Sequence, residues 1–445
     1  MTLIRRTLMP GALIGLAVLL ALFGGPAGAA TPPVERVSVA NDGTQASLAP
    51  SDDPSISGDG TRIAFESEDD DLVPGDTNGK DDIFVRDTVA GTTTRVSVAS
   101  DGSQGNNHSR LPVISADGTK VAFLSWSDNL VAGDTNVRED VFVHDLTTGT
   151  TTRVSLADDG SQVPLVLVST ISISGDGSRV AFVSNWSTLV PNDTNAALDV
   201  FVRDTVAGTT TRVSVSTGGA QGDDDSSSPS LSADGTTVAY QSEARNLVAG
   251  DNNLVEDVFL HDLATGTTTR ASVSDSEAEA TGGRSIQPSL NADGTRVAFE
   301  SRATNLVTGD SNGFFDVFVR DTTAATTVRA SVASDGTQAN DSSGAPAING
   351  DGTTVAFHSV ATNLVAGDTN TALDVFVRDI TAGTTARVSL TDAGAQANGI
   401  SDAPSINTAG NRIAFNSRVA LIPADTNGSD DAYVADTACC VDTDG

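Results

Sequence analysis

The stretch Pro54-Ser-Ile-Ser-Gly-Asp59-Gly60-Thr-Arg-Ile-Ala-Phe65-Glu-Ser67 decides the fold, because the chain repeats it. Further copies of its Asp-Gly pair begin, at intervals of 58 or 59 residues, at Asp117, Asp176, Asp234, Asp293 and Asp351. A seventh copy, Pro404 to Ser417, carries Ala409-Gly410 at that point. Self-similarity at a fixed period indicates one structural unit packed against its own copies.

Two further motifs keep the same period. The first, Asp82-Ile-Phe-Val-Arg-Asp87, returns from Asp140, Asp199, Asp257, Asp316, Asp374 and Asp431. The second, Arg95-Val-Ser-Val98, has counterparts that begin at Arg36, Arg153, Arg212, Arg270, Arg329 and Arg387. Each motif therefore occurs seven times, and the repeat covers nearly the whole chain.

Each unit has the residues of four short strands. Ser-x-Asp-Gly between apolar runs is typical of a tight hairpin turn, because glycine accepts a positive φ and Asp bonds nearby backbone. The runs Ile63-Ala-Phe65 and Ile83-Phe-Val85 are apolar at consecutive positions, which indicates strands covered on both faces. Gly91 to Thr94 is interpreted as a turn into a fourth strand, Arg95 to Val98. Such a unit, repeated radially, predicts a propeller blade.

The order of the motifs predicts how the repeat closes. The chain opens with the fourth-strand motif at Arg36 and ends after the third-strand motif, Asp431 to Asp436. If Glu35 to Val39 pairs with the strand ending at Asp436, seven four-stranded blades form a ring without free edges. The alternative is an open solenoid, which would leave two unmatched ends. We predict an all-β, seven-bladed β-propeller in which the N-terminal strand completes the last blade.

The pattern Pro-x-apolar-Ser-x-Asp-Gly-x-x-Val/Ile-Ala-Phe-x-Ser resembles the WD40-like (PD40) propeller repeat of the TolB type. The resemblance covers nearly all of the chain that follows residue 29, and it implies a β-propeller fold. It also implies, as one functional possibility, a component of a TolB-like envelope complex.

The chain ends are expected to lie outside the propeller. Arg5 and Arg6, the apolar run from Gly11 to Phe23 and the small residues Ala27-Gly28-Ala29 are typical of a secretory signal peptide, assigned to residues 1–29. We therefore expect a secreted or periplasmic protein without a membrane span. The propeller is assigned to residues 34–437, and residues 438–445 form a tail with the adjacent cysteines Cys439 and Cys440.

The composition excludes two classes of partner. The formal net charge is −33, and the chain without residues 1–29 has 23 basic against 58 acidic side chains. Nucleic acids and anionic membranes are bound through clustered Lys and Arg, so neither is an expected partner. Recurring runs of Val, Ala, Ile and Phe argue against disorder.

An Asp-x-Asn-x-x-x-Asp loop between the second and third strands is the most regular polar motif. Its residues are Asp76, Asn78, Asp82; Asp134, Asn136, Asp140; Asp193, Asn195, Asp199; Asp251, Asn253, Asp257; Asp310, Asn312, Asp316; Asp368, Asn370, Asp374; and Asp425, Asn427, Asp431. Three oxygen-bearing side chains in one loop suit calcium, which takes six to eight oxygens. We predict calcium as a cofactor; the alternative is that Asp and Asn cap a turn.

Partner-binding residues are predicted where the repeat breaks. The connection before the third unit, Val163-Pro-Leu-Val-Leu-Val168, is apolar where other units are polar. Trp126 and Trp186, the two tryptophans, begin the neighbouring second-to-third-strand connections, on the face that holds the Asp-x-Asn loops. Trp126, Trp186, Leu165 and Leu167 are therefore proposed as a ligand contact. Alternatively, they fill gaps between blades.

The predicted function is a non-catalytic, exported binding scaffold with a protein or carbohydrate ligand on the polar loop face. The alternative is a carbohydrate-active enzyme, a lyase or glycosidase, that uses acidic loop residues. His108, His144, His261 and His358 are widely separated. No residue is assigned a catalytic role.

Overall fold

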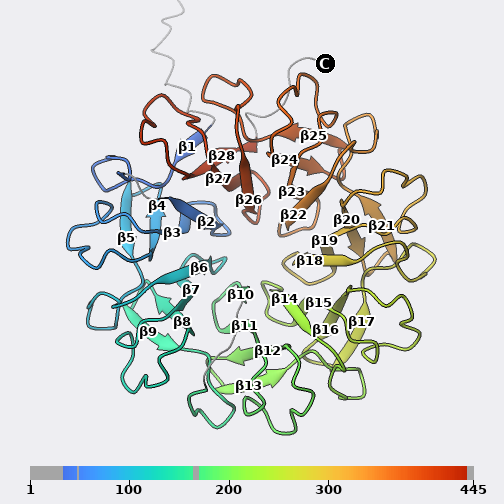
Figure 1. Ribbon diagram of the computed structural model, residues 1–445, viewed down its shortest axis with the longest axis horizontal. Coiled ribbons are helices and arrows are strands. Elements are labelled where there is room, and N and C mark those ends of the chain that lie inside the picture. Colours follow the sequence, from blue (N-terminus) through green and yellow to red (C-terminus); the bar gives the residue numbers. More distant parts are fainter. Residues whose placement is uncertain (1–33, 48–49, 164–169, 438–445) are drawn as a thin grey trace, which may run out of the picture. The chain divides into compact units, whose positions relative to one another are not determined.

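The computed structural model describes residues 34–47, 50–163 and 170–437. The predicted signal peptide, the tail with Cys439 and Cys440, and the candidate residues Leu165 and Leu167 lie outside these ranges. The described residues form 28 strands in seven four-stranded antiparallel sheets, arranged around a centre (Figure 1). The predicted seven-bladed all-β propeller is confirmed. Among the described residues, no helix has the length and apolar character needed to cross a membrane.

The strands of each blade run in order from the centre outward. The innermost strands are β2 (Ser51–Ile56), β6 (Ser109–Ile114), β10 (Ile171–Ile173), β14 (Ser226–Leu231), β18 (Ser285–Leu290), β22 (Ser343–Ile348) and β26 (Ser401–Ile406). The second strands are β3 (Arg62–Ser67), β7 (Lys120–Ser125), β11 (Arg179–Ser184), β15 (Thr237–Ser242), β19 (Arg296–Ser301), β23 (Thr354–Ser359) and β27 (Arg412–Ser417).

The third strands hold the Asp-x-Phe-type motif, and the fourth lie at the rim. The third strands are β4 (Asp82–Asp87), β8 (Asp140–Asp145), β12 (Asp199–Asp204), β16 (Asp257–Asp262), β20 (Asp316–Asp321), β24 (Asp374–Asp379) and β28 (Asp431–Asp436). The fourth strands are β5 (Thr92–Arg95), β9 (Thr150–Arg153), β13 (Thr209–Arg212), β17 (Thr267–Arg270), β21 (Thr326–Arg329), β25 (Thr384–Arg387) and β1 (Val34–Arg36).

The first strand closes the ring, as predicted. β1 pairs antiparallel with β28, with Val34 opposite Ala435 and Arg36 opposite Tyr433. The seventh blade therefore has the order β1-β28-β27-β26 and joins residues from both ends of the described chain. In each of the seven blades, the third strand is paired with a second strand on one side and a fourth strand on the other. All seven blades are therefore four-stranded.

The fourth strand begins earlier than the sequence pattern predicted. β5 is Thr92–Arg95, with Thr92 opposite Asp87 and Arg95 opposite Phe84, and the ladder continues through a bond from Val96 N to Ile83 O (2.8 Å). The turn is correspondingly shorter, because Gly91 N already bonds Asp87 O. Threonines are good strand formers, so Thr92 to Thr94 join the sheet rather than the turn.

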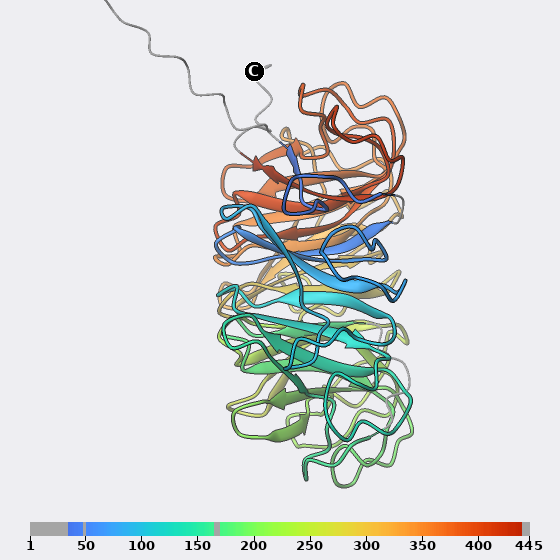
Figure 2. The same ribbon diagram turned by 90° about the vertical axis from the view of Figure 1, so that its left-hand side faces the viewer.

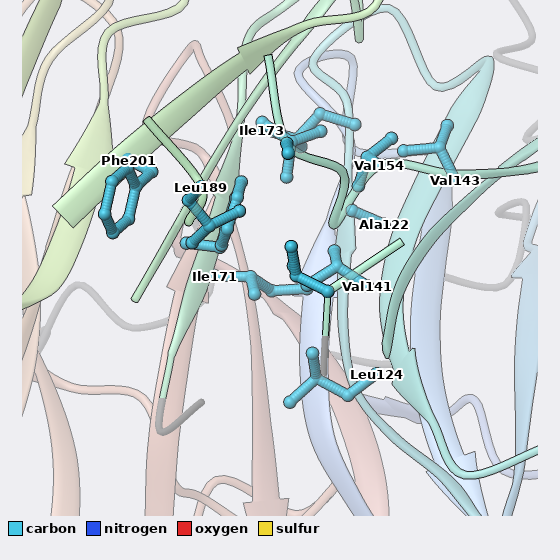
Figure 3. Packing of buried hydrophobic residues seen from close by; sticks show 13 residues of the cluster. Ala122, Leu124, Val141, Val143, Val154, Ile171, Ile173, Leu189 and Phe201 are labelled. Atoms are coloured by element: carbon cyan, nitrogen blue, oxygen red, sulfur yellow. The ribbon is translucent and has the colours of Figure 1, made fainter. Parts of the chain in front are cut away.

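The apolar runs pack between neighbouring blades. In the cluster between the second and third blades, Ile171 lies beside Val141, and Leu189 lies beside Phe201 (Figure 3). Seven such clusters occur among the described residues, one at each blade contact. Within every blade, an aromatic ring of the second strand stacks on one of the third, at centroid distances of 5.7–6.2 Å. Consecutive apolar positions therefore face a neighbour on each side, as expected for a blade.

The two faces of the ring, seen edge-on in Figure 2, hold different connections. The hairpin face has the Ser-x-Asp-Gly turns, and the loop face has the Asp-x-Asn loops and the links between blades. On the hairpin face, backbone N–H groups donate to carbonyls of adjacent blades at 2.8–3.1 Å: Gly58 to Ala116, Asp117 to Gly175, Gly175 to Ala233, Asp234 to Ala292, Ala292 to Gly350, Gly350 to Thr408 and Thr408 to Gly58. These residues surround a cavity of about 140 Å³ on the ring axis.

Candidate binding face

The Asp-x-Asn loop forms a capped turn at the start of each third strand. In the first blade, Lys80 N donates to Asn78 Oδ1 at 2.9 Å. Asn78 Nδ2 donates to Gly105 O at 2.9 Å, which ties the loop to the link that follows β5. The prediction that these two connections share a face is therefore confirmed, and Asn has a structural role in the turn.

The two Asp residues of each loop lie beside an arginine from the fourth strand. Arg95 Nη1 lies 3.0 Å from Asp76 Oδ1 and 3.5 Å from Asp82 Oδ2. The same acid–arginine cluster joins Arg153 to Asp134 and Asp140, Arg212 to Asp193 and Asp199, Arg270 to Asp251 and Asp257, Arg329 to Asp310 and Asp316, Arg387 to Asp368 and Asp374, and Arg36 to Asp425 and Asp431. Each loop thus has an internal cation.

A serine and a glutamine complete the cluster. The serine two residues after each arginine donates to the second Asp in all seven blades, as Ser97 does to Asp82. Gln104 Nε2 donates to Asp76 Oδ1 at 2.6 Å. Sequence reasoning missed these partners, although the arginine follows the second Asp by 13 residues in six units. That constant spacing was the available signal.

Burial shifts the titration of these carboxyls. The second Asp is fully buried in every blade, and burial raises the pKa of Asp82, Asp140 and Asp431 to about 6. Serine and arginine oppose this shift by stabilising the carboxylate. The clusters of the first, second and seventh blades therefore begin to bind protons at mildly acidic pH.

The fourth blade has one more carboxylate than the others. Glu279 replaces the glutamine, and its Oε1 lies 2.7 Å from Arg270 Nη1. Oxygens of Asp251, Asp257 and Glu279 lie within 4.8 Å of one another. Among the described residues, this is the one cluster of three acidic side chains that are close enough to share a metal ion. Burial and the charge of Asp257 raise the pKa of Asp251 to about 6. Calcium in all seven loops stays a prediction; this loop has the donor set that suits it best, because one arginine faces three carboxylates.

Three further positions meet on the loop face of the six blades in which all three are described. We call them the variable triad: the residue before the inner strand, the residue after the second strand and the residue before the second Asp. In five of these six blades a backbone bond joins the first two, as between Trp126 N and His108 O (3.0 Å). The triads are Pro50, Glu68, Asp81; His108, Trp126, Glu139; Asp225, Glu243, Glu256; Arg284, Arg302, Phe315; Ser342, Val360, Leu373; and Ile400, Arg418, Asp430. In the third blade the second and third positions are Asn185 and Leu198, and the position that the repeat aligns with His108 lies outside the described residues.

The two tryptophans have different surroundings. The Trp126 side chain is 38% exposed, and the Arg110 guanidinium lies 5.0 Å from its ring centroid while pairing with Glu139 at 2.7 Å. Trp186 is partly buried and packs against the cluster that contains Val163. No interaction between the two rings is seen among the described residues, and the predicted partner contact stays a prediction centred on Trp126.

A group of carboxyls lies at the loop-face ends of the inner and second strands, where Asp52 of β2 is opposite Glu66 of β3. Burial raises the pKa of Glu66 to about 7, although Leu111 N of the next blade donates to its Oε2 at 2.9 Å. Burial and the nearby charges of Asp430, Asp53 and Asp402 raise the pKa of Asp52 to about 6. These groups can exchange protons near neutral pH.

Comparison with known proteins finds no matching family model and no matching curated protein. Among solved structures, an oligogalacturonate lyase in complex with manganese is 15% identical, with a TM-score of 0.53 over 91% of this chain and 92% of the other. The β-propeller domain of the Trilobed protease from Pyrococcus furiosus is 12% identical, with a TM-score of 0.51 over 83% and 91%. TolB from Acinetobacter baumannii is 16% identical, with a TM-score of 0.41 over 73% and 62%. The likeness to the lyase and to the protease domain supports the β-propeller fold alone.

Proposed function

We propose that this chain is an exported, non-catalytic binding scaffold that holds its ligand on the loop face. The observation that carries the proposal is the contrast between a repeated frame and non-repeated side chains at the same backbone positions. The acid–arginine cluster recurs in all seven blades, whereas the variable triads differ in charge and size. Side chains that pack the fold are repeated; those that vary are free to recognise something else.

The triads give the loop face a distinct chemistry in each sector. The fourth blade presents three carboxyls, Asp225, Glu243 and Glu256, and the fifth presents Arg284 and Arg302. The sixth presents the apolar Val360 and Leu373. Acidic, basic and apolar sectors in sequence around a ring suit an asymmetric ligand that spans several blades, such as a protein.

The test measures binding and turnover together. Purified protein is immobilised and exposed to extracellular proteins and a glycan array, and every captured ligand is assayed for cleavage. Capture without cleavage, weakened by Trp126→Ala and unchanged by Val89→Ala on the opposite face, supports the scaffold. Val89 is a suitable control because it is 80% exposed. The proposal would be overturned if capture were unchanged in Trp126→Ala and in variants of every other triad. Envelope proteins among the captured ligands would place the scaffold in a TolB-like complex.

We also propose that calcium binds the loop of Asp251, Asp257 and Glu279. The excess of carboxylates over arginine there supports this, since calcium prefers several carboxylate and carbonyl oxygens. A ligand that binds the folded state raises the melting temperature. Calorimetry in excess calcium and in chelator should therefore give a higher Tm with calcium. Equal Tm values would end the proposal.

A carbohydrate-active enzyme is the second candidate, favoured by the carboxyls at the inner strands. Glu66, with a pKa raised to about 7, and Asp52, with a pKa raised to about 6, could donate and accept protons at neutral pH. Incubation with acidic and neutral polysaccharides distinguishes the two functions. New reducing ends or unsaturated products that disappear in Glu66→Gln would establish the enzyme in place of the scaffold.

A further inference from the structure

The fifth blade places two arginines on one aromatic ring. The guanidinium carbon Cζ of Arg302 lies 4.6 Å from the ring centroid of Phe315, and that of Arg284 lies 5.6 Å away. Arg284 pairs with Glu256 of the fourth blade at 3.2 Å and stays about half exposed. Arg302 is exposed, and within the described ranges no carboxylate lies within ion-pair distance of its guanidinium.

Of the described arginines with no carboxylate at ion-pair distance, Arg302 alone lies over an aromatic ring; the others are Arg86, Arg138, Arg203, Arg245 and Arg378. With 58 acidic residues available, the arginines of the acid–arginine clusters all contact carboxylates. Packing over an aromatic ring holds Arg302 by cation–π attraction and leaves its N–H donors directed to solvent. A pre-oriented guanidinium fork matches a carboxylate in a bidentate manner. The arrangement therefore suits a carboxylate from outside the chain.

The surroundings of the two arginines restrict the rest of the ligand. Phe314 is 36% exposed and precedes Phe315. On the other side, Phe315 O accepts a bond from Ser343 N of the sixth blade (2.8 Å), whose triad includes Val360 and Leu373. Aromatic and aliphatic neighbours favour an apolar group beside the carboxylate. The acidic triad of the fourth blade repels further negative charge, which disfavours a polyanion.

We infer that the surface formed by Arg284, Arg302, Phe314 and Phe315 binds a peptide segment through one carboxylate flanked by an apolar side chain. This inference rests on the proposed function and names the chemistry of one sector of the loop face. The guanidinium groups take the carboxylate, and Phe314 packs against the apolar side chain. A sugar acid carries the same carboxylate but offers hydroxyls where the surface is apolar, so the peptide fits better.

The inference is tested with small probes on the whole protein. N-acetylphenylalanine supplies a carboxylate beside an apolar ring, N-acetylphenylalaninamide removes the charge alone, and galacturonate replaces the apolar body. The ¹⁵N–¹H signals of the arginine side chains report binding. We expect N-acetylphenylalanine to shift the Arg284 and Arg302 signals with a Kd of about 1–10 mM, a range in which a single weak contact is still measurable, and the other two probes to bind at least fivefold more weakly.

Variants separate the site from general charge effects. Arg302→Gln should weaken N-acetylphenylalanine binding at least fivefold, whereas Arg245→Gln, which removes an exposed arginine of the fourth blade, should leave it unchanged. Equal binding of the amide, stronger binding of galacturonate, or equal effects of the two variants would overturn the inference. The scaffold proposal would survive any of these results if mutation of other triads still abolishes ligand capture. Failure of the inference is thereby distinguished from failure of the proposed function.

Discussion

The two faces of the ring are built from the same seven units but differ in what is repeated. On the hairpin face, backbone groups of all seven blades bond one another in a closed circle, which includes Gly58, Gly175 and Gly350. On the loop face, the acid–arginine clusters repeat but the variable triads beside them do not. The repeated bonds of the hairpin face have a structural role, whereas the loop face combines a repeated frame with side chains that differ between blades.

The largest effect is expected where the frame also closes the ring. Arg36 is buried and lies 3.3 Å from Asp425 and 3.7 Å from Asp431. Arg36→Ala leaves both buried carboxylates without their cation, and removing one partner of a buried pair costs about 3–5 kcal/mol. Calorimetry should show a large fall in Tm. The exposed Arg138→Ala is the control, and similar Tm values for both variants would contradict the structural role of the cluster.

An intermediate effect is expected on the hairpin face. A Cβ at Gly175 would lie 2.8 Å from Ala233 O and 3.1 Å from Ala233 Cβ. Because the backbone circle cannot yield locally, Gly175→Ala should destabilise by about 1–3 kcal/mol. The matched control is Gly218→Ala, whose Cβ would meet only Ser216 Oγ at 3.7 Å. Urea unfolding midpoints that coincide for the two variants would show that the circle contributes little.

Much of this fold follows from the sequence because the repeat carries it. Turn residues, apolar runs and motif order predicted the blades and the pairing of β1 with β28. The clusters were missed because Arg95 and Asp82 belong to motifs that were interpreted separately, as markers of different strands. The sequence also could not tell the exposed triad residues from neighbours that pack into the core. Trp126 directly follows β7 and is partly exposed, whereas Trp186 lies two residues beyond β11 and packs against a buried cluster. Side-chain direction depends on the neighbouring blade, which composition does not reveal.

The pH dependence of stability should separate the two faces. The buried Asp82, Asp140 and Asp431 have pKa values of about 6, above those of unfolded Asp, so the folded state binds more protons and Tm should rise as the pH falls from 7.5 to about 5. On the hairpin face, bonds from backbone N–H groups, chiefly that of Ala90, lower the pKa of Asp87. This stabilisation is lost below about pH 4, the ordinary range of Asp. A Tm that falls steadily from pH 7.5 would contradict the cluster pKa values.

The smallest stability effect is expected within the fourth blade. Glu279→Gln gives this cluster the composition of the other six and removes one of three neighbouring carboxylates. In chelator, Tm should fall slightly, because Asn252 N and Arg270 stabilise the Glu279 carboxylate and lower its pKa. In calcium, the variant should lack the rise expected for the original chain. Gln104→Glu is the converse variant in the first blade and should gain calcium sensitivity; identical calcium responses in all three proteins would refute the assignment of Glu279.

The separation of frame and triad is tested most directly by exchanging one triad for another. Arg284→Ser, Arg302→Val and Phe315→Leu together give the fifth blade the triad of the sixth, Ser342, Val360 and Leu373. Tm and N-acetylphenylalanine binding are measured on the same triple variant. We predict a Tm within a few degrees of the original protein, because surface ion pairs contribute little, together with loss of binding. A fall in Tm as large as that of Arg36→Ala, or binding that persists, would contradict the account.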